Sequence, residues 1–332
     1  MSVNPFYRPA RLSAVNDRCR ELWQDLVQHE NEYRIRSRRL DCGAVLMDMG
    51  VSETGSLEAG RILTELCQGG LAKARIGMTQ VAGVPLPEIF NETLHPAAGC
   101  MDMQMGLPFP NALLSGPIRL FIEPLRFVEA DIPLSEAKDA VVALIEPYPG
   151  APEFSDKEAR LLSEMSGVAP EHIRIILAPG NSLPGSTQVS GRAVEDVVLT
   201  IQRSLLIDSS KVIDICGRAP ICPYYEDKPG VKRLDADDFL HYIAEVYLTY
   251  YSEEGEDVAA LCRNLTFESL DIFGSYWADM LEAAGGDFFK IPNITDVNRV
   301  GRVVINDRRT GRVYAAGRLR EDLIEARLTA AL

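Results

Sequence analysis

The sequence lacks the clustered cysteines and histidines that mark metal sites and redox motifs. Its seven cysteines and four histidines are scattered along the chain, and no two cysteines are separated by only two residues. The closest pair, Cys216 and Cys222, has five residues between its members, which is a poor spacing for a metal clip. We therefore predict no metal site, and buried thiols in a reducing compartment.

Long apolar runs and an excess of positive charge are also missing. No stretch approaches membrane-spanning length, and residues 1–5 do not contain the apolar core of a signal peptide. The formal net charge of −14 argues against non-specific binding of nucleic acid, because two polyanions repel each other. We expect a cytoplasmic protein with neither a membrane nor a nucleic-acid partner. A local basic pocket for an anionic ligand is still compatible with this charge.

What the sequence does contain is a globular composition. Of the 332 residues, 46% are hydrophobic and 25% are charged, enough for a substantial core and against wholesale disorder. Predicted strands and helices interleave along the chain, which predicts an α/β fold. Four prolines and glycines within residues 147–152 predict a boundary between an N-terminal subdomain, 1–146, and a C-terminal subdomain, 153–332, with strands free to cross between them.

The stretch from residue 173 to residue 206 has the clearest organisation. Residues 173–178 form an apolar run of the length of a buried strand, and a loop rich in glycine and proline follows at 179–185. Ser186 and Thr187 are placed to cap a helix. Apolar residues then recur at three- and four-residue steps and predict one buried helix face, namely Val194, Val197, Val198, Ile201 and Leu205.

Arg192 and Glu195 lie three positions apart on this predicted helix and therefore share a face. From spacing alone, such a pair is typical of a solvent-exposed ion pair that contributes little to stability.

Other elements follow from caps, alternation and turns. We predict a helix that begins at Ser13 and a helix that begins at Ser155, the second with a capping box to Glu158 and an end at Gly167. The apolar face of the first comprises Val15, Cys19, Leu22, Trp23, Leu26 and Val27. Another helix, ending before Gly69, is expected to turn Ile62, Leu63, Leu66 and Cys67 inward. Apolar or alternating runs predict strands at 33–38, 139–146 and 211–216, two short strands within 239–251, and a closing hairpin with Gly311 at its turn. A last helix ends the chain.

Residues 177–195, which read LAPGNSLPGSTQVSGRAVE, resemble the central segment of the methenyltetrahydromethanopterin cyclohydrolases. That family carries a similar AP–S–GS–Q–AR–E pattern. Shorter patches resemble other family segments: HPA at 95–97, SGPIR at 115–119, GRAPI at 217–221, which is a loop in the family, and GDFFKI at 286–291. The chain departs from the family in a longer segment at 44–54, a shorter region after His95, and an altered segment at 227–238.

The resemblance implies two α/β subdomains with a pterin-binding cleft between them, and a homotrimer. The implied reaction hydrolyses the methenyl bridge of methenyl-tetrahydromethanopterin, or of its dephospho form, to N5-formyl-tetrahydromethanopterin. The implied setting is one-carbon metabolism, as in methylotrophy. It needs no metal and no redox cofactor. By this match Glu195 is the general base and Arg192 modulates it. The residues expected to bind the substrate are Ser115, Gly116, Arg119, Ser182, Ser186, Gln188, Arg218 and Pro220.

Two alternatives stay open. One is a divergent paralogue in the same tetrahydromethanopterin-linked pathway, for example in cofactor biosynthesis, that keeps the fold but catalyses a different reaction. The other is a pterin-binding protein without catalysis. The three departures from the family pattern favour these alternatives, and the sequence alone does not separate them from a cyclohydrolase.

Overall fold

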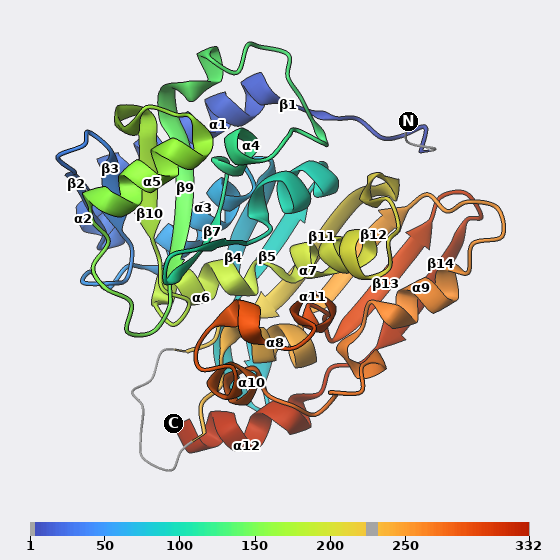
Figure 1. Ribbon diagram of the computed structural model, residues 1–332. Coiled ribbons are helices and arrows are strands. Elements are labelled where there is room, and N and C mark those ends of the chain that lie inside the picture. Colours follow the sequence, from blue (N-terminus) through green and yellow to red (C-terminus); the bar gives the residue numbers. More distant parts are fainter. Residues whose placement is uncertain (1–3, 224–231, 332) are drawn as a thin grey trace. The chain divides into compact units, whose positions relative to one another are not determined.

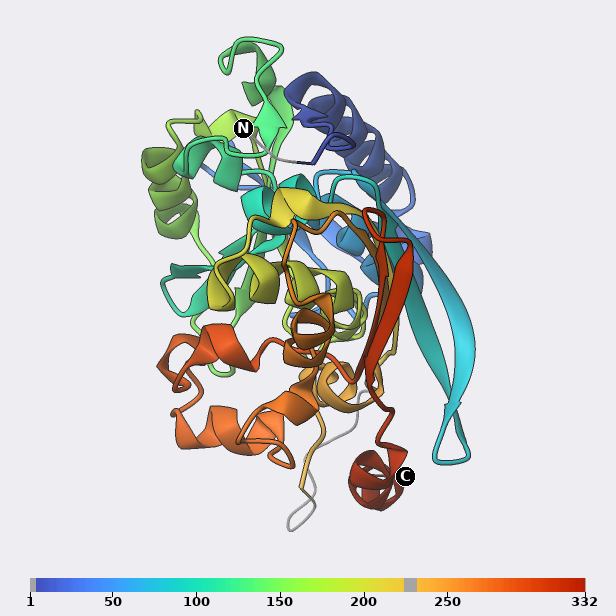
Figure 2. The same ribbon diagram turned by 90° about the vertical axis from the view of Figure 1, so that its right-hand side faces the viewer.

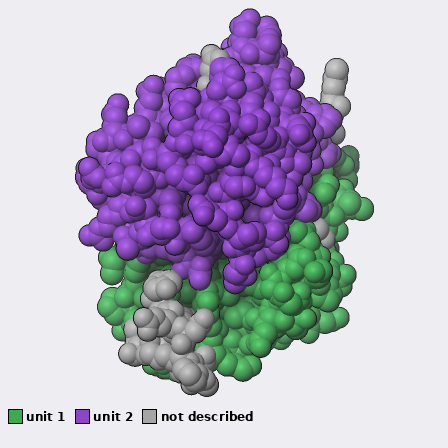
Figure 3. Space-filling model, turned by 60° about the vertical axis from the view of Figure 1, so that its left-hand side comes forward, with its two compact units in different colours: residues 1–7, 74–96, 189–332 green, residues 8–73, 97–188 purple. Residues whose placement is uncertain are grey.

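The computed structural model describes residues 4–223 and 232–331, and it has a mixed α/β architecture, as expected (Figure 1). The chain forms two compact units, shown in different colours in Figure 3. Unit 1 comprises residues 1–7, 74–96 and 189–332, and unit 2 comprises residues 8–73 and 97–188. This division differs from the expected one at 146–153. The prolines and glycines of 147–152 form a loop within unit 2, so they mark a connection rather than a domain boundary.

Unit 2 is built on a six-stranded sheet with the order β2-β3-β10-β9-β7-β6. Its central strands β3, β10 and β9 are parallel, and the outer strands pair antiparallel to their neighbours. The predicted strands at 173–178 and 139–146 are confirmed as β10 and β9. The strand bounds are β2 Arg36–Arg39, β3 Val45–Asp48, β6 Leu107–Phe109, β7 Ala112–Ser115, β9 Val141–Pro147 and β10 Ile173–Leu177.

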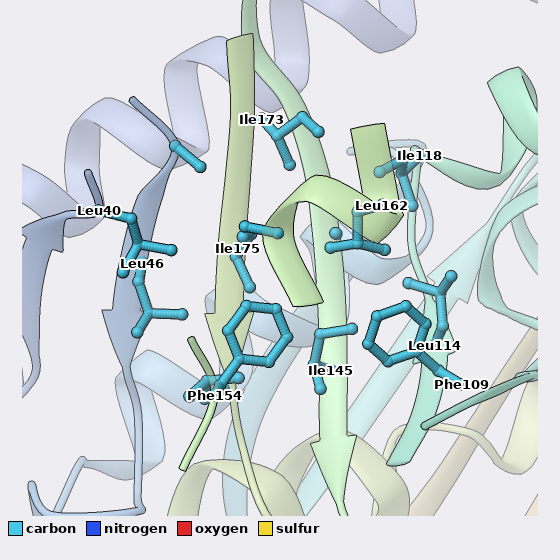
Figure 4. Close-up of a cluster of buried hydrophobic side chains, with 14 of the residues drawn as sticks. Leu40, Leu46, Phe109, Leu114, Ile118, Ile145, Phe154, Leu162, Ile173 and Ile175 are labelled. Carbon is cyan, nitrogen blue, oxygen red and sulfur yellow. The ribbon is translucent and has the colours of Figure 1, made fainter. Parts of the chain in front are cut away.

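One face of this sheet packs against α5 (Asp156–Ser166), as Figure 4 shows. Alternate residues of β10, Ile173 and Ile175, point into the same cluster as Leu162 of α5. Burying each such side chain contributes about 1.5–3 kcal/mol. The predicted capping box of α5 is present, and the helix ends at Gly167 with φ 63°.

Further helices complete unit 2. In α1 (Leu12–Gln28), Val15, Cys19, Trp23 and Leu26 are buried as predicted, but Val27 is 43% exposed. The Val27 assignment was wrong because the helix rotates 100° per residue and carries this position past the buried stripe. The remaining elements of unit 2 are β1 Ala10–Arg11, α2 Glu30–Tyr33, α3 Leu57–Cys67, the π-helix η1 Ala97–Gln104, α4 Arg119–Ile122, β8 Val128–Glu129, and the 3₁₀-helices η2 Glu136–Ala140 and η3 Pro170–His172. Tyr33, predicted as strand, is therefore helical.

Unit 1 is built on a second six-stranded sheet with the order β14-β13-β12-β11-β5-β4. Figure 2 shows the long β4–β5 hairpin in cyan and the closing β13–β14 hairpin in red. The closing hairpin is as predicted, with Gly311 at φ 69°. The strand bounds are β4 Ala72–Val81, β5 Val84–Thr93, β11 Val212–Pro220, β12 Glu245–Tyr250, β13 Arg302–Asp307 and β14 Arg312–Gly317.

Two predictions for unit 1 were wrong. The first half of the expected strand pair at 239–251 is a helix, α8 (Ala236–Ile243), because Asp235 and Asp238 form a capping box that starts a helix before the aromatic residues. Residues 217–220, expected as a loop, continue strand β11. The altered segment at 227–238 lies partly outside the described residues. Further α-helices in the described part of unit 1 are α9 Val258–Asn264, α10 Trp277–Ala283, α11 Ile294–Val297 and α12 Glu321–Ala331.

The central helix is broken into α6 (Leu183–Ser190), α7 (Ala193–Leu199) and the π-helix η4 (Thr200–Ser204). Ser186 and Thr187 lie inside α6 and do not cap it. The capping contact comes from Ser182, whose Oγ accepts a hydrogen bond from the Gly185 amide at 3.1 Å. In the described part of the chain, no helix has the length and hydrophobicity of a membrane span.

Candidate functional site

Arg192 and Glu195 form an ion pair at the start of α7. Arg192 Nη1 donates to Glu195 Oε2 at 2.8 Å, and the side chains are only 11% and 5% exposed. The pair is therefore not the solvent-exposed one that spacing alone indicates. When an ion pair is buried, removal of one partner leaves the other charge uncompensated and is strongly unfavourable. In this arrangement a buried carboxylate is oriented by a fixed guanidinium, which is a geometry that a general base can use.

The break before α7 is held by side chains from neighbouring elements of unit 1. Asn91 on β5 donates to the Gly191 carbonyl at 2.8 Å, and Ser190 Oγ donates to the Pro220 carbonyl at 2.9 Å. These bonds connect the break to β5 and to the end of β11. Hydrogen bonds to β5 and β11 therefore fix the position of the first turn of α7, where Arg192 and Glu195 lie.

The absence of a side chain at Gly217 lets α7 approach β11 closely. A Cβ at Gly217 would lie 3.3 Å from Cγ1 of Val194 on α7 and 3.0 Å from Cγ2 of Val246 on β12. Figure 1 shows α7 over this face of the sheet. Four residues of the predicted apolar side of the helix are buried here, with Val194, Val197, Val198 and Ile201 at 0% exposure. The fifth, Leu205, follows the π-helix η4 and is only partly buried.

Asp196, which sequence reasoning missed, is the neighbour of Glu195 on α7 and is also buried. Burial raises the pKa of the Asp196 carboxyl well above its ordinary value, and the charges of Glu195 and Asp237 add to the effect. Arg192 acts in the opposite direction. The available signal was an acidic residue inside a predicted buried helix.

In unit 2, Ser115 and Gln188 are brought together by the thiol of Cys67. Cys67 Sγ lies 3.4 Å from Ser115 Oγ, and Gln188 Nε2 donates to the same sulfur at 3.5 Å. All three side chains are buried. Gly116 follows at φ 94°, where a Cβ would lie 3.3 Å from the Val142 carbonyl, so the turn requires glycine. Sequence reasoning placed Cys67 on the inner side of a helix but gave it no part in the site.

Ser182 and Ser186 hold the loop that leads into α6. Ser182 Oγ lies 2.8 Å from the Pro179 carbonyl oxygen and accepts from the Gly185 amide. The Ser186 amide donates to the Ser182 carbonyl at 2.7 Å. Both side chains are buried, so these two expected ligand residues are already part of an ordered turn.

Arg119 is fully buried in unit 2 and is bound by its own neighbours. Its Nη1 donates to the Met101 carbonyl at 2.8 Å, and its Nη2 pairs with Glu123 one helical turn later. These contacts give the guanidinium a structural role at the turn that contains Ser115 and Gly116.

Arg218 lies on the face of the unit 1 sheet opposite to α7. Because Gly217 faces α7 and side chains alternate along a strand, the next residue points away from it. The structure therefore does not bring Arg218 together with Glu195. The backbone of Pro220, in contrast, contacts Ser190 beside the break.

The guanidinium of Arg218 belongs to a row of charges across four strands. Its Nη1 lies 3.0 Å from Glu88 Oε2 on β5, and its Nη2 lies 2.6 Å from Glu245 Oε2 on β12. Arg302 on β13 extends the row, with Nη1 3.2 Å from Glu245 Oε1. The positive charge of Arg218 is therefore paired with a carboxylate on each neighbouring strand.

The expected site residues divide between the units. Glu195, Arg192, Arg218 and Pro220 belong to unit 1, and the other six belong to unit 2. Within residues 4–223 and 232–331, no group of three or more histidine, cysteine, aspartate and glutamate side chains is arranged to hold a metal ion.

The profile of the Cyclohydrolase (MCH) family matches residues 14–327. The chain belongs to this family. A protein of Methanocaldococcus jannaschii is 30% identical over 325 residues, covering 95% of this chain and 98% of its own length. One of Methanothermobacter marburgensis is 32% identical over 323 residues, with 94% and 98% covered. Both are named methenyltetrahydromethanopterin cyclohydrolase. The expected family and the enzyme class, a cyclohydrolase, are confirmed.

Proposed function

We propose that this cyclohydrolase hydrolyses the methenyl bridge of methenyl-tetrahydromethanopterin and forms the N5-formyl compound. The observation that carries the proposal is the buried Arg192–Glu195 pair, at 2.8 Å, in the segment that resembles the family most closely. Family membership and the names of the relatives support the substrate. The dephospho form of the substrate is included in the proposal.

The chemistry follows from the charge of the substrate. The methenyl carbon is bonded to two nitrogens and carries positive charge, so it accepts the oxygen of a water molecule. Glu195 takes one proton from that water as the carbon–oxygen bond forms. The adduct then loses its hydroxyl proton as the C=O bond forms and the bond between the carbon and the second nitrogen breaks. This leaves the formyl group on N5, and the departing nitrogen receives a proton. Arg192 holds the Glu195 carboxylate in place through its hydrogen bond.

We further propose that the pterin binds in a ligand cleft. Glu195 and Arg192 supply the chemistry, while Ser115, Gly116, Ser182, Ser186 and Gln188 contact the pterin. Arg119, Arg218 and Pro220 were expected as ligands, and their contacts within the protein favour supporting roles instead. The proposal includes a metal-independent reaction in the cytoplasm by a homo-oligomer, a trimer by resemblance.

The deciding experiment is an assay of the purified protein with methenyl-tetrahydromethanopterin, its dephospho form, and the corresponding folate as a control. We expect hydration of the methanopterin compounds, which is measured as the loss of the methenyl absorbance. Binding of the pterin without hydration would overturn the proposal in favour of a pterin-binding protein or a divergent paralogue. If the protein neither binds nor hydrates these compounds, it has no tetrahydromethanopterin site.

A further inference from the structure

The longer segment at 44–54, one of the three departures from the family pattern, leads into a loop that is organised by one carboxylate. Asp48, at the end of β3, accepts hydrogen bonds from three successive amides of the following loop. Its Oδ1 accepts from Gly50 at 2.9 Å and from Val51 at 2.8 Å, and its Oδ2 accepts from Ser52 at 2.9 Å. We call residues 48–55 the Asp48 loop. Its shape depends on Asp48 because these amides have no strand or helix to join.

The Asp48 loop lies directly against the loop that leads into α6, residues 179–185, which we call the serine loop. Both loops leave the same edge of the sheet, since β3 and β10 are parallel neighbours. The Met49 amide donates to the Leu177 carbonyl at 2.9 Å, and Ser182 Oγ lies 3.4 Å from the Met49 carbonyl oxygen.

Two glycines allow the Asp48 loop to contact the serine loop closely. At Gly50, with φ 140°, a Cβ would lie 2.3 Å from Ser182 Cβ. At Gly55, with φ 64°, a Cβ would lie 2.2 Å from Pro184 Cγ. Both positions require glycine for backbone conformation and for space. Any displacement of the Asp48 loop is therefore passed on to Ser182 and to the start of α6.

We infer that Asp48 is a positioning residue for pterin binding, which it serves by holding the serine loop and the α6 residues Ser186 and Gln188 in place. This inference rests on the proposed function. Asp48 acts through the wall of the site and not on the reacting atoms. Its loss therefore weakens binding of the pterin, while the Arg192–Glu195 pair keeps its own contacts on α7.

A graded pair of substitutions tests the inference. Asp48→Asn keeps an oxygen for the Gly50 and Val51 amides but cannot accept from Ser52, whereas Asp48→Ala removes all three bonds. We expect KM to rise on the order of tenfold for Asp48→Ala and by less for Asp48→Asn, with kcat changed by less than about twofold. Unchanged KM in both variants, or a loss of kcat at constant KM, would overturn the inference.

A matched pair of glycine substitutions provides a second test that does not depend on how well Asp48→Ala folds. Gly50→Ala and Gly150→Ala both place an alanine at positive φ, but a Cβ at Gly150 would meet nothing within 4 Å. Both lie in unit 2. We expect KM to rise only for Gly50→Ala. An equal effect of the two substitutions would show that backbone strain alone is responsible and would overturn the inference.

The dissociation constant of the pterin separates this inference from the proposed function. If the wild-type protein binds methenyl-tetrahydromethanopterin without hydrating it, the proposed reaction fails, and the dissociation constants of the Asp48 and Gly50 variants still test the positioning role. A dissociation constant that increases from the wild type to Asp48→Asn and further to Asp48→Ala would support the positioning role. Absence of pterin binding by the wild type would overturn both.

Discussion

Glu195 and Asp196 are neighbours on α7, yet only Glu195 pairs with Arg192, at 2.8 Å. Burial raises the pKa of the Asp196 carboxyl well above its ordinary value, and among the described residues no guanidinium lies at hydrogen-bond distance from Asp196. The two carboxyl groups therefore receive different predictions.

Glu195→Gln should slow hydration by about 10²–10⁴-fold while the pterin still binds, because glutamine has the size of glutamate but cannot accept the proton. The turnover rate and the pterin dissociation constant are the measurements. Glu92→Gln is a suitable control, since Glu92 pairs with Arg75 at 3.1 Å on an exposed surface. Full turnover by Glu195→Gln would rule out this residue as the base.

Arg192→Ala should lower kcat, because the Glu195 carboxylate loses the guanidinium that holds it at 2.8 Å. Steady-state kinetics of the variant and of the wild type are the measurements. Arg75→Ala, which removes an arginine from an exposed pair, should leave kcat unchanged. A wild-type kcat in Arg192→Ala would contradict the assigned role.

Asp196→Asn should make the folded state more stable at neutral pH. Burial raises the pKa of Asp196 in the folded state above its value of about 3.9 in the unfolded chain. The folded protein therefore holds a proton that the unfolded chain releases, and its stability falls as pH rises above about 4. Asparagine does not titrate, so the variant does not lose stability in this way. The free energy of unfolding in urea should be equal for the variant and the wild type near pH 4, and the variant should become the more stable protein toward pH 7. A variant that is less stable than the wild type at pH 7 would contradict this prediction.

Arg218→Ala should leave KM unchanged and should lower stability by less than about 1 kcal/mol, the usual range for partly exposed ion pairs. Its side chain is 43% exposed and is paired with Glu88 and Glu245 on the sheet face away from α7. Steady-state kinetics and urea unfolding of the variant are the measurements. A several-fold rise in KM would restore Arg218 as a substrate ligand.

Treatment with a chelator should leave the hydration rate unchanged, as the scattered cysteines and histidines of the sequence predict. The assay compares the dialysed protein before and after chelation, with added divalent cations as the control. Loss of activity on chelation that one defined cation restores would refute metal independence.

The sequence by itself determined the features that depend on neighbours along the chain. The capping box of α5, its end at Gly167, the strand β10 and the hairpin at Gly311 all follow from local conformational preferences. The approach of Arg192 and Glu195 is local as well, because residues three apart on a helix share a face.

Only the tertiary structure decided the features that depend on contacts between distant segments. The pair at Arg192 and Glu195 is buried because β5 and β11 hold the break before α7, which no local pattern encodes. Arg218 points away from α7 because pairing with β5 and β12 continues β11 through residues that resemble a loop. Likewise, the Asp48 loop acquires its role only because parallel pairing of β3 with β10 brings it against Ser182, which follows it by more than a hundred residues.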